Sequence, residues 1–79
     1  MAKVDIDMTG DELGFVTFVI ENVAEETGVA GDVVYRALTE DSDLLYDYIV
    51  PCYDVLHTQG KEYIIRDVLE HLEERGVSL

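Results

Sequence analysis

Apolar residues recur at intervals of three and four positions along most of this 79-residue chain. This is the spacing of one face of an α-helix, whereas a half-buried strand would alternate at every second position. The clearest stretch contains Ala30, Val33, Val34, Ala37 and Leu38. The pattern predicts an all-α fold, a compact bundle of four to five short helices.

Capping residues and glycines divide this pattern into separate helices. Thr9 and Glu12 form a capping-box sequence in front of an apolar segment, and Gly28 supplies a residue suited to a left-handed stop. We therefore expect the first helix over residues 10–27. The next apolar stretch predicts a second helix near residues 30–39.

Pro51 divides the second half of the chain. Proline removes a backbone donor and crowds the preceding turn, at a cost of about 3 kcal/mol in a helix interior. Two arrangements remain open: one bent helix over residues 43–57, or a short helix that ends near Ile49 and a second one with Pro51 in its first turn. The last helix is expected over about residues 59–75, with Thr58 as its cap.

The first eight residues alternate apolar and polar side chains, which suits an edge strand or an unanchored tail. We expect residues 1–8 to be a flexible N-terminal tail and residues 9–76 to form a single helical domain, since so short a chain supports one core. No apolar run approaches the roughly 20 residues that cross a bilayer, and the N-terminus lacks the apolar stretch of a secretory signal. These features predict a cytoplasmic protein with no membrane partner.

The charge is strongly unbalanced, with 18 acidic residues, 5 basic residues and a formal net charge of −13. Nucleic-acid binders gain most of their affinity by placing Lys and Arg on phosphates, so this balance disfavours a nucleic-acid partner. It also argues against a helix–turn–helix around Gly60. The same field would attract a basic protein partner, although acidity also serves simply to keep a small protein dissolved. Within the last helix, Arg66 is spaced to pair with Glu62 and Glu70.

Cys52, His57 and His71 have the greatest chemical capacity in the chain. Five positions along one helix turn a side chain by about 140°, so Cys52 and His57 would point apart. No oxyanion element accompanies them, and together with Asp54 they lack metal-ligand spacing. We therefore expect no catalytic residue, no metal and no cofactor, and a protein that is not an enzyme. Cys52 is simpler as a core residue, and His57 as a helix-end residue that donates to a carbonyl or packs on Tyr53.

The aromatic residues divide into two groups. The only phenylalanines, Phe15 and Phe18, are expected at the centre of the core. The tyrosines exceed what a small core easily hides, and tyrosine is enriched at protein interfaces, but it also lies at the edges of cores. They are Tyr35, Tyr46, Tyr48, Tyr53 and Tyr63.

One segment resembles a known family. It reads Tyr53-Asp54-Val55-Leu56-His57-Thr58-Gln59-Gly60, followed by Glu62-Tyr63-Ile64 and Asp67-Val68, and it is similar to short bacterial proteins known only as domain of unknown function 3791. The similarity covers most of residues 12–75. The resemblance implies an all-helical, soluble, intracellular protein with no established catalytic residue, cofactor or ligand. It also implies a gene neighbourhood, because some members lie beside proteins resembling ADP-ribosyltransferases, the arrangement of a toxin and its neutraliser.

These observations predict a non-enzymatic protein–protein interaction module, and the resemblance suggests an antitoxin-like, neutralising partner of a neighbouring gene product. The partner would be that operon neighbour or another basic protein. Its binding residues would be Tyr53, Asp54, His57, Thr58 and Gln59. A demanding helix junction needs the same residue types, so a purely structural corner is an equal interpretation. Two alternatives remain: a self-associating helical domain, such as a homodimer, and, less favoured, a DNA-binding transcriptional regulator.

Overall fold

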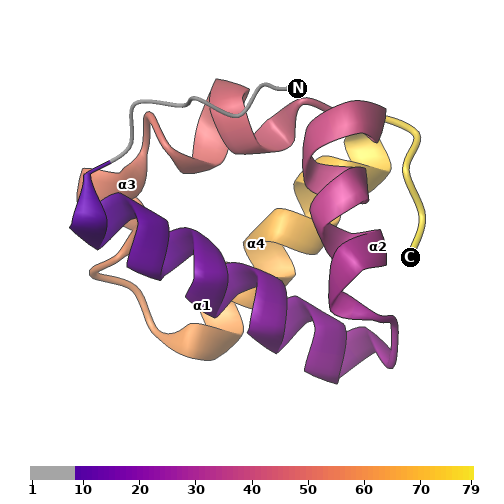
Figure 1. Ribbon diagram of the computed structural model, residues 1–79, viewed down its shortest axis with the longest axis horizontal. Helices are drawn as coiled ribbons and strands as arrows, with labels where there is room; N and C mark the ends of the chain where they lie inside the picture. Colours follow the sequence, from indigo (N-terminus) through magenta and orange to yellow (C-terminus); the bar gives the residue numbers. More distant parts are fainter. Residues whose placement is uncertain (1–8) are drawn as a thin grey trace.

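The computed structural model describes residues 9–79, so the expected tail over residues 1–8 lies outside the described residues. Every regular element between residues 9 and 79 is helical (Figure 1). The helix α2 (Gly31–Arg36) continues without a break into the π-helical segment η1 (Ala37–Asp41). This part of the chain therefore contains five separate helices. The predicted all-α bundle is confirmed. The elements are α1 (Gly10–Thr27), α2 (Gly31–Arg36), η1 (Ala37–Asp41), η2 (Leu45–Ile49, also π-helical), α3 (Tyr53–Leu56) and α4 (Lys61–Glu74).

Both ends of α1 form as predicted. The backbone N–H of Glu12 donates to Oγ1 of Thr9, and the N–H of Thr9 donates to Oε1 of Glu12, each at 3.1 Å. At the other end Gly28 adopts a left-handed φ of 73° and donates to the carbonyl of Ala24. Local sequence alone therefore determines the length of this helix.

The second helix continues through η1 to Asp41, beyond the expected range of 30–39. Its final turns are π-helical, with the wider i to i+5 hydrogen-bond spacing. The hydroxyl of Ser42 then donates to the carbonyl of Ala37 at 2.7 Å and accepts from the backbone N–H of Leu44 at 3.1 Å. The Ser42 side chain therefore hydrogen-bonds to the end of η1 and to the backbone just before η2.

Pro51 separates two short helices, so the bent-helix alternative is wrong. η2 ends at Ile49, and α3 begins at Tyr53, just after the proline instead of around it. α4 begins at Lys61, two positions later than expected, because the residue at its N-cap is Gly60 and not Thr58. The Thr58 hydroxyl instead donates backward to the carbonyl of the preceding turn.

The core lies where α1 packs against α2 and α4. The fully buried centre is aliphatic. Phe15 belongs to the core and Phe18 packs against it, so the phenylalanines form part of the core but not its centre. Phe15 is 9% exposed and contacts Tyr53 of α3, and Phe18, at the middle of α1, is half-buried and packs against the core. The fully buried residues are Val19, Val23, Val34, Leu38, Leu44, Leu45, Ile49, Val68 and Leu72.

No polar or charged side chain of residues 9–79 is buried, although Asp67 is only 16% exposed. None of the helices in the same range combines the length and apolar character needed to cross a membrane.

Candidate functional site

The five residues predicted to bind a partner lie together on α3 and on the loop that joins it to α4. Tyr53 is half-buried, whereas the side chains of Asp54, His57, Thr58 and Gln59 are exposed. We call residues 53–59 the corner. The exposed polar side chains of the corner are accessible to a partner.

Contacts within the corner hold it in shape. The rings of Tyr53 and His57 stack with centroids 4.4 Å apart and planes 9° from parallel. Nδ1 of His57 also lies 2.7 Å from the carbonyl oxygen of Tyr53, so this histidine makes both contacts expected from the sequence. The Thr58 hydroxyl donates to the carbonyl of Val55 at 2.7 Å. An edge contact to Phe15, with centroids 5.5 Å apart, attaches the corner to α1.

The outer surface of the corner is partly apolar and partly charged. Val55 is 65% exposed, and Asp54 has no hydrogen-bond or ion-pair partner among the described residues. Burial raises the pKa of Tyr53 above its ordinary value, and the negative charges of Asp11, Asp54 and Glu12 add to this increase. The phenol therefore stays neutral at physiological pH and keeps a hydroxyl that can donate and accept.

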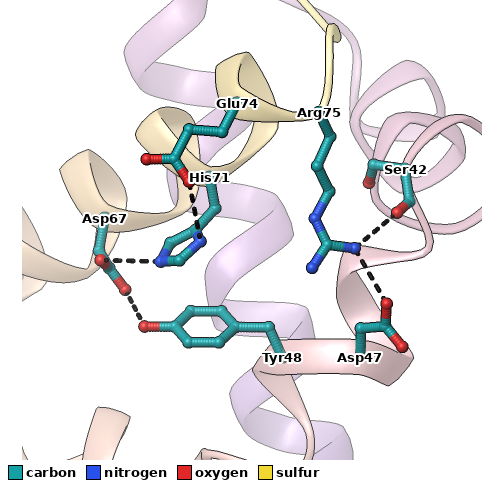
Figure 2. A network of polar contacts seen from close by, with 7 residues as sticks. All are labelled: Ser42, Asp47, Tyr48, Asp67, His71, Glu74 and Arg75. Carbon is teal, nitrogen blue, oxygen red and sulfur yellow. Dashed lines mark hydrogen bonds and ion pairs between the residues drawn. The ribbon is translucent and has the colours of Figure 1, made fainter.

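A second polar cluster joins η2 to one side of α4, and we call it the paired side (Figure 2). The hydroxyl of Tyr48 donates to Oδ2 of Asp67 at 2.6 Å, and Nε2 of His71 lies 3.5 Å from Oδ1 of the same carboxylate. The rings of Tyr48 and His71 pack with centroids 4.1 Å apart. Burial raises the pKa of Tyr48 well above its usual range, and the hydrogen bond to Asp67 contributes to this increase.

Arg75 extends the paired side beyond the end of α4. Its Nη1 donates to the carbonyl of Ser42 at 2.8 Å and to Oδ2 of Asp47 at 3.1 Å. Figure 2 shows this guanidinium pointing away from His71 and toward the turn between η1 and η2. Two separate points therefore attach the C-terminal half of α4 to the middle of the chain.

The opposite side of α4 forms a shallow groove with the end of α1. The groove encloses about 460 Å³, and its floor is Ile65, which is 7% exposed, and the half-buried Leu69. Its rim consists of four glutamates and one arginine, all exposed: Glu26 of α1 and Glu62, Arg66, Glu70 and Glu73 of α4. None of these rim residues forms an ion pair or a side-chain hydrogen bond within residues 9–79. The predicted pairs of Arg66 with Glu62 and Glu70 are therefore wrong.

Sequence reasoning missed both the paired side and the groove. The i, i+4 spacing of Asp67 and His71 was a local signal for part of the network, but it does not reveal Tyr48, which is 19 positions from Asp67. Cys52 is half-buried and packs against the core, which is close to the core position expected from the sequence. Between residues 9 and 79 no group of three or more His, Cys, Asp or Glu side chains is placed to hold a metal ion.

Comparison with known proteins gives one match. A family model described as "Protein of unknown function (DUF3791)" matches residues 14–75, which include the corner, the groove and the paired side. No curated protein and no solved structure matches the chain. The family assignment therefore supports the resemblance and brings no activity with it.

Proposed function

The chain belongs to the DUF3791 family, proteins of unknown function, and from this premise we propose that it is a non-enzymatic protein–protein interaction module that binds through the corner. One observation carries the proposal. Val55 is held 65% exposed beside three exposed polar side chains, Asp54, His57 and Gln59, on a short segment that its own contacts keep rigid.

This composition suits a small interface. Protein interfaces combine a desolvated apolar centre with a polar rim that supplies hydrogen bonds. Val55 would supply the apolar contact, and Asp54, which has no hydrogen-bond or ion-pair partner in the described chain, would accept a cation or an N–H group. Because the ring stack and the His57 hydrogen bond already fix the backbone, binding would order few additional groups, which lowers the entropic cost of association.

The charge favours a basic partner. No charged side chain of residues 9–79 is buried, and the whole chain has a net charge of −13, so its field would speed encounter with a positively charged protein. We propose that this partner is the product of a neighbouring gene, which the chain neutralises by covering part of its surface. The rate of association should then fall steeply with salt.

Co-expression with the products of the genes that flank this one, followed by size-exclusion chromatography, tests the proposal. One product should co-elute with the wild-type chain, and Val55→Asp should abolish co-elution. Val33→Asp is the matched control, because Val33 is 39% exposed on α2, at the far end of the molecule from α3 (Figure 1). Circular dichroism would show that both variants keep their helices.

Two results would overturn the proposal. Absence of co-elution with either neighbour would remove the proposed partner. Equal losses with Val55→Asp and Val33→Asp would show that the corner is not the binding surface. Light scattering tests the self-association alternative. If the wild type is a dimer and Val55→Asp is a monomer, the partner that binds the corner is a second copy of this chain.

A further inference from the structure

We propose that the groove between α1 and α4 receives a basic amphipathic helix of the partner protein. This inference rests on the proposed function, because it supposes a protein partner, and it adds the chemistry and shape of the segment that the partner contributes. It concerns a surface separate from the corner, on residues that sequence reasoning did not assign to any binding surface.

The length of the hollowed surface fits a helix. The groove shares Glu62 and Arg66 with a second hollow at the start of α4, and it shares Leu69 and Glu73 with a third that reaches Val77. The three hollows therefore follow the whole of α4, whose 14 residues extend about 21 Å at 1.5 Å per residue. A partner helix of about four turns would fit along it, in the helix-in-groove mode of recognition.

The chemistry of the groove specifies the kind of helix. Ile65 and Leu69 form an apolar floor, so the partner needs an apolar stripe with the i, i+3, i+4, i+7 spacing. The rim presents the four glutamates of the groove, so the flanks of that stripe must carry Lys or Arg. Because these glutamates have no ion-pair partner within the described chain, they would not have to break an internal contact in order to bind.

Arg66 adds a constraint on register. It is the one cation that lines the central hollow of the described structure, and it is also free of ion pairs there. A partner helix that was basic at every polar position would place a like charge against it. One acidic residue among the basic flanks would instead pair with Arg66 and fix how far along α4 the helix binds.

A direct test uses a synthetic peptide as the probe. The peptide has capped ends, leucines at the stripe positions and lysines elsewhere, with one glutamate on the flank. Titration into ¹⁵N-labelled chain should shift amide resonances along residues 60–77 and near Glu26, with affinity falling as salt rises. A peptide of the same composition, rearranged so that the leucines form no stripe, should not bind. Shifts confined to other elements, or equal binding of both peptides, would overturn the proposal.

Two matched triple variants separate the groove from overall acidity. Glu26→Gln, Glu70→Gln and Glu73→Gln together remove three charges from the rim. Glu21→Gln, Asp32→Asn and Asp41→Asn remove three charges from exposed positions outside the three hollows. The rim triple should weaken peptide binding at least about tenfold, and the control triple by no more than about threefold, since close charge pairs exceed the effect of the diffuse field. Equal weakening would show that only the net charge matters and would overturn the groove assignment.

The co-expression assay distinguishes failure of this inference from failure of the proposed function. If a neighbouring gene product still co-elutes with the rim triple but not with Val55→Asp, the groove inference is wrong and the interaction function stands. If no neighbour co-elutes while the peptide binds with the expected dependence on the rim, the groove stands and the proposed partner is wrong.

Discussion

The two sides of α4 carry similar residues, but only on one side do these residues contact each other. On the paired side, Asp67 accepts from Tyr48 and lies against His71. On the groove side, Arg66 stands one helical turn from both Glu62 and Glu70 and pairs with neither. Both sides place a carboxylate four positions from a nitrogen-bearing side chain, so sequence spacing does not explain the difference.

The explanation lies in what faces each side. Across the paired side, a phenol reaches Asp67 and excludes part of the solvent from it, which makes the ordered arrangement favourable. Across the groove the residue of α1 that lines the same hollow is another acid, Glu26. An exposed i, i+4 pair contributes only about 0.2–0.5 kcal/mol, which is comparable to the entropy lost by holding two long side chains together. The comparison teaches that the paired side fastens the fold, whereas the groove side keeps its charges available.

Replacing one acid on each side gives the largest expected contrast. Asp67→Ala should lower the free energy of unfolding by about 1–3 kcal/mol, because it leaves the partly buried Tyr48 hydroxyl without its acceptor. Glu70→Ala, on the groove side, should change it by less than about 0.5 kcal/mol. Urea titrations followed by circular dichroism measure both values. Similar losses in the two variants would remove the distinction between the sides.

Tyr48→Phe should have a smaller effect, about 1 kcal/mol, because the ring remains packed on His71 and only the hydrogen bond is lost. It should also change the response to alkali. The raised pKa of Tyr48 means that the folded chain holds the phenol proton more tightly than the unfolded chain does. Its contribution is therefore complete below the unfolded pKa of about 10 and declines as pH rises toward the folded pKa.

Comparison of Tyr48→Phe with Tyr35→Phe isolates this effect, since Tyr35 is 45% exposed and is not among the groups that raise the pKa of Tyr48. Urea midpoints measured on both sides of about pH 10 should converge for the wild type and Tyr48→Phe as pH rises. A constant difference between them across that range would contradict the raised pKa of Tyr48 in the folded chain.

The smallest effect is expected at the exposed end of the paired side. A double-mutant cycle with Arg75→Ala and Asp47→Ala should give a coupling of about 0.2–1 kcal/mol that decreases with added salt. The 3.1 Å contact is solvent-accessible, with side-chain exposures of 33% and 57%. A coupling free energy larger than that of the Tyr48–Asp67 pair would contradict the expectation that Tyr48 and Asp67 stabilise the paired side more than Arg75 and Asp47 do.

Sequence predicted best those features that are decided locally. The ends of α1 follow from Thr9, Glu12 and Gly28, each of which acts on backbone groups within a few positions of itself. The predicted start of α4 was wrong because Thr58 can either cap the following helix or donate to a carbonyl of the preceding turn. In the structure its hydroxyl donates to the carbonyl of Val55. How deeply each phenylalanine is buried depends on which helices pack against it, and apolar spacing does not contain that information.

The candidate surfaces show the same limit. The corner residues were selected from the family resemblance, and they lie together because they are nearly consecutive in sequence. The paired side and the groove require contacts between distant parts of the chain, such as Arg75 with Asp47, 28 positions apart. Composition indicated that the surface would be acidic, but only the packing of α1 on α4 shows which acids share an apolar floor.

The π-helical geometry of η2 restricts how this chain can change in length. Its turn is one residue wider than an ordinary helical turn, with the N–H of Val50 donating to the carbonyl of Leu45. Loss of a single residue there would restore regular winding but rotate the flanking side chains by about 100° relative to one another. Tyr48 would then miss Asp67, and Ile49 would leave the core. The segment should therefore accept exchanges between similar amino acids far more readily than deletions.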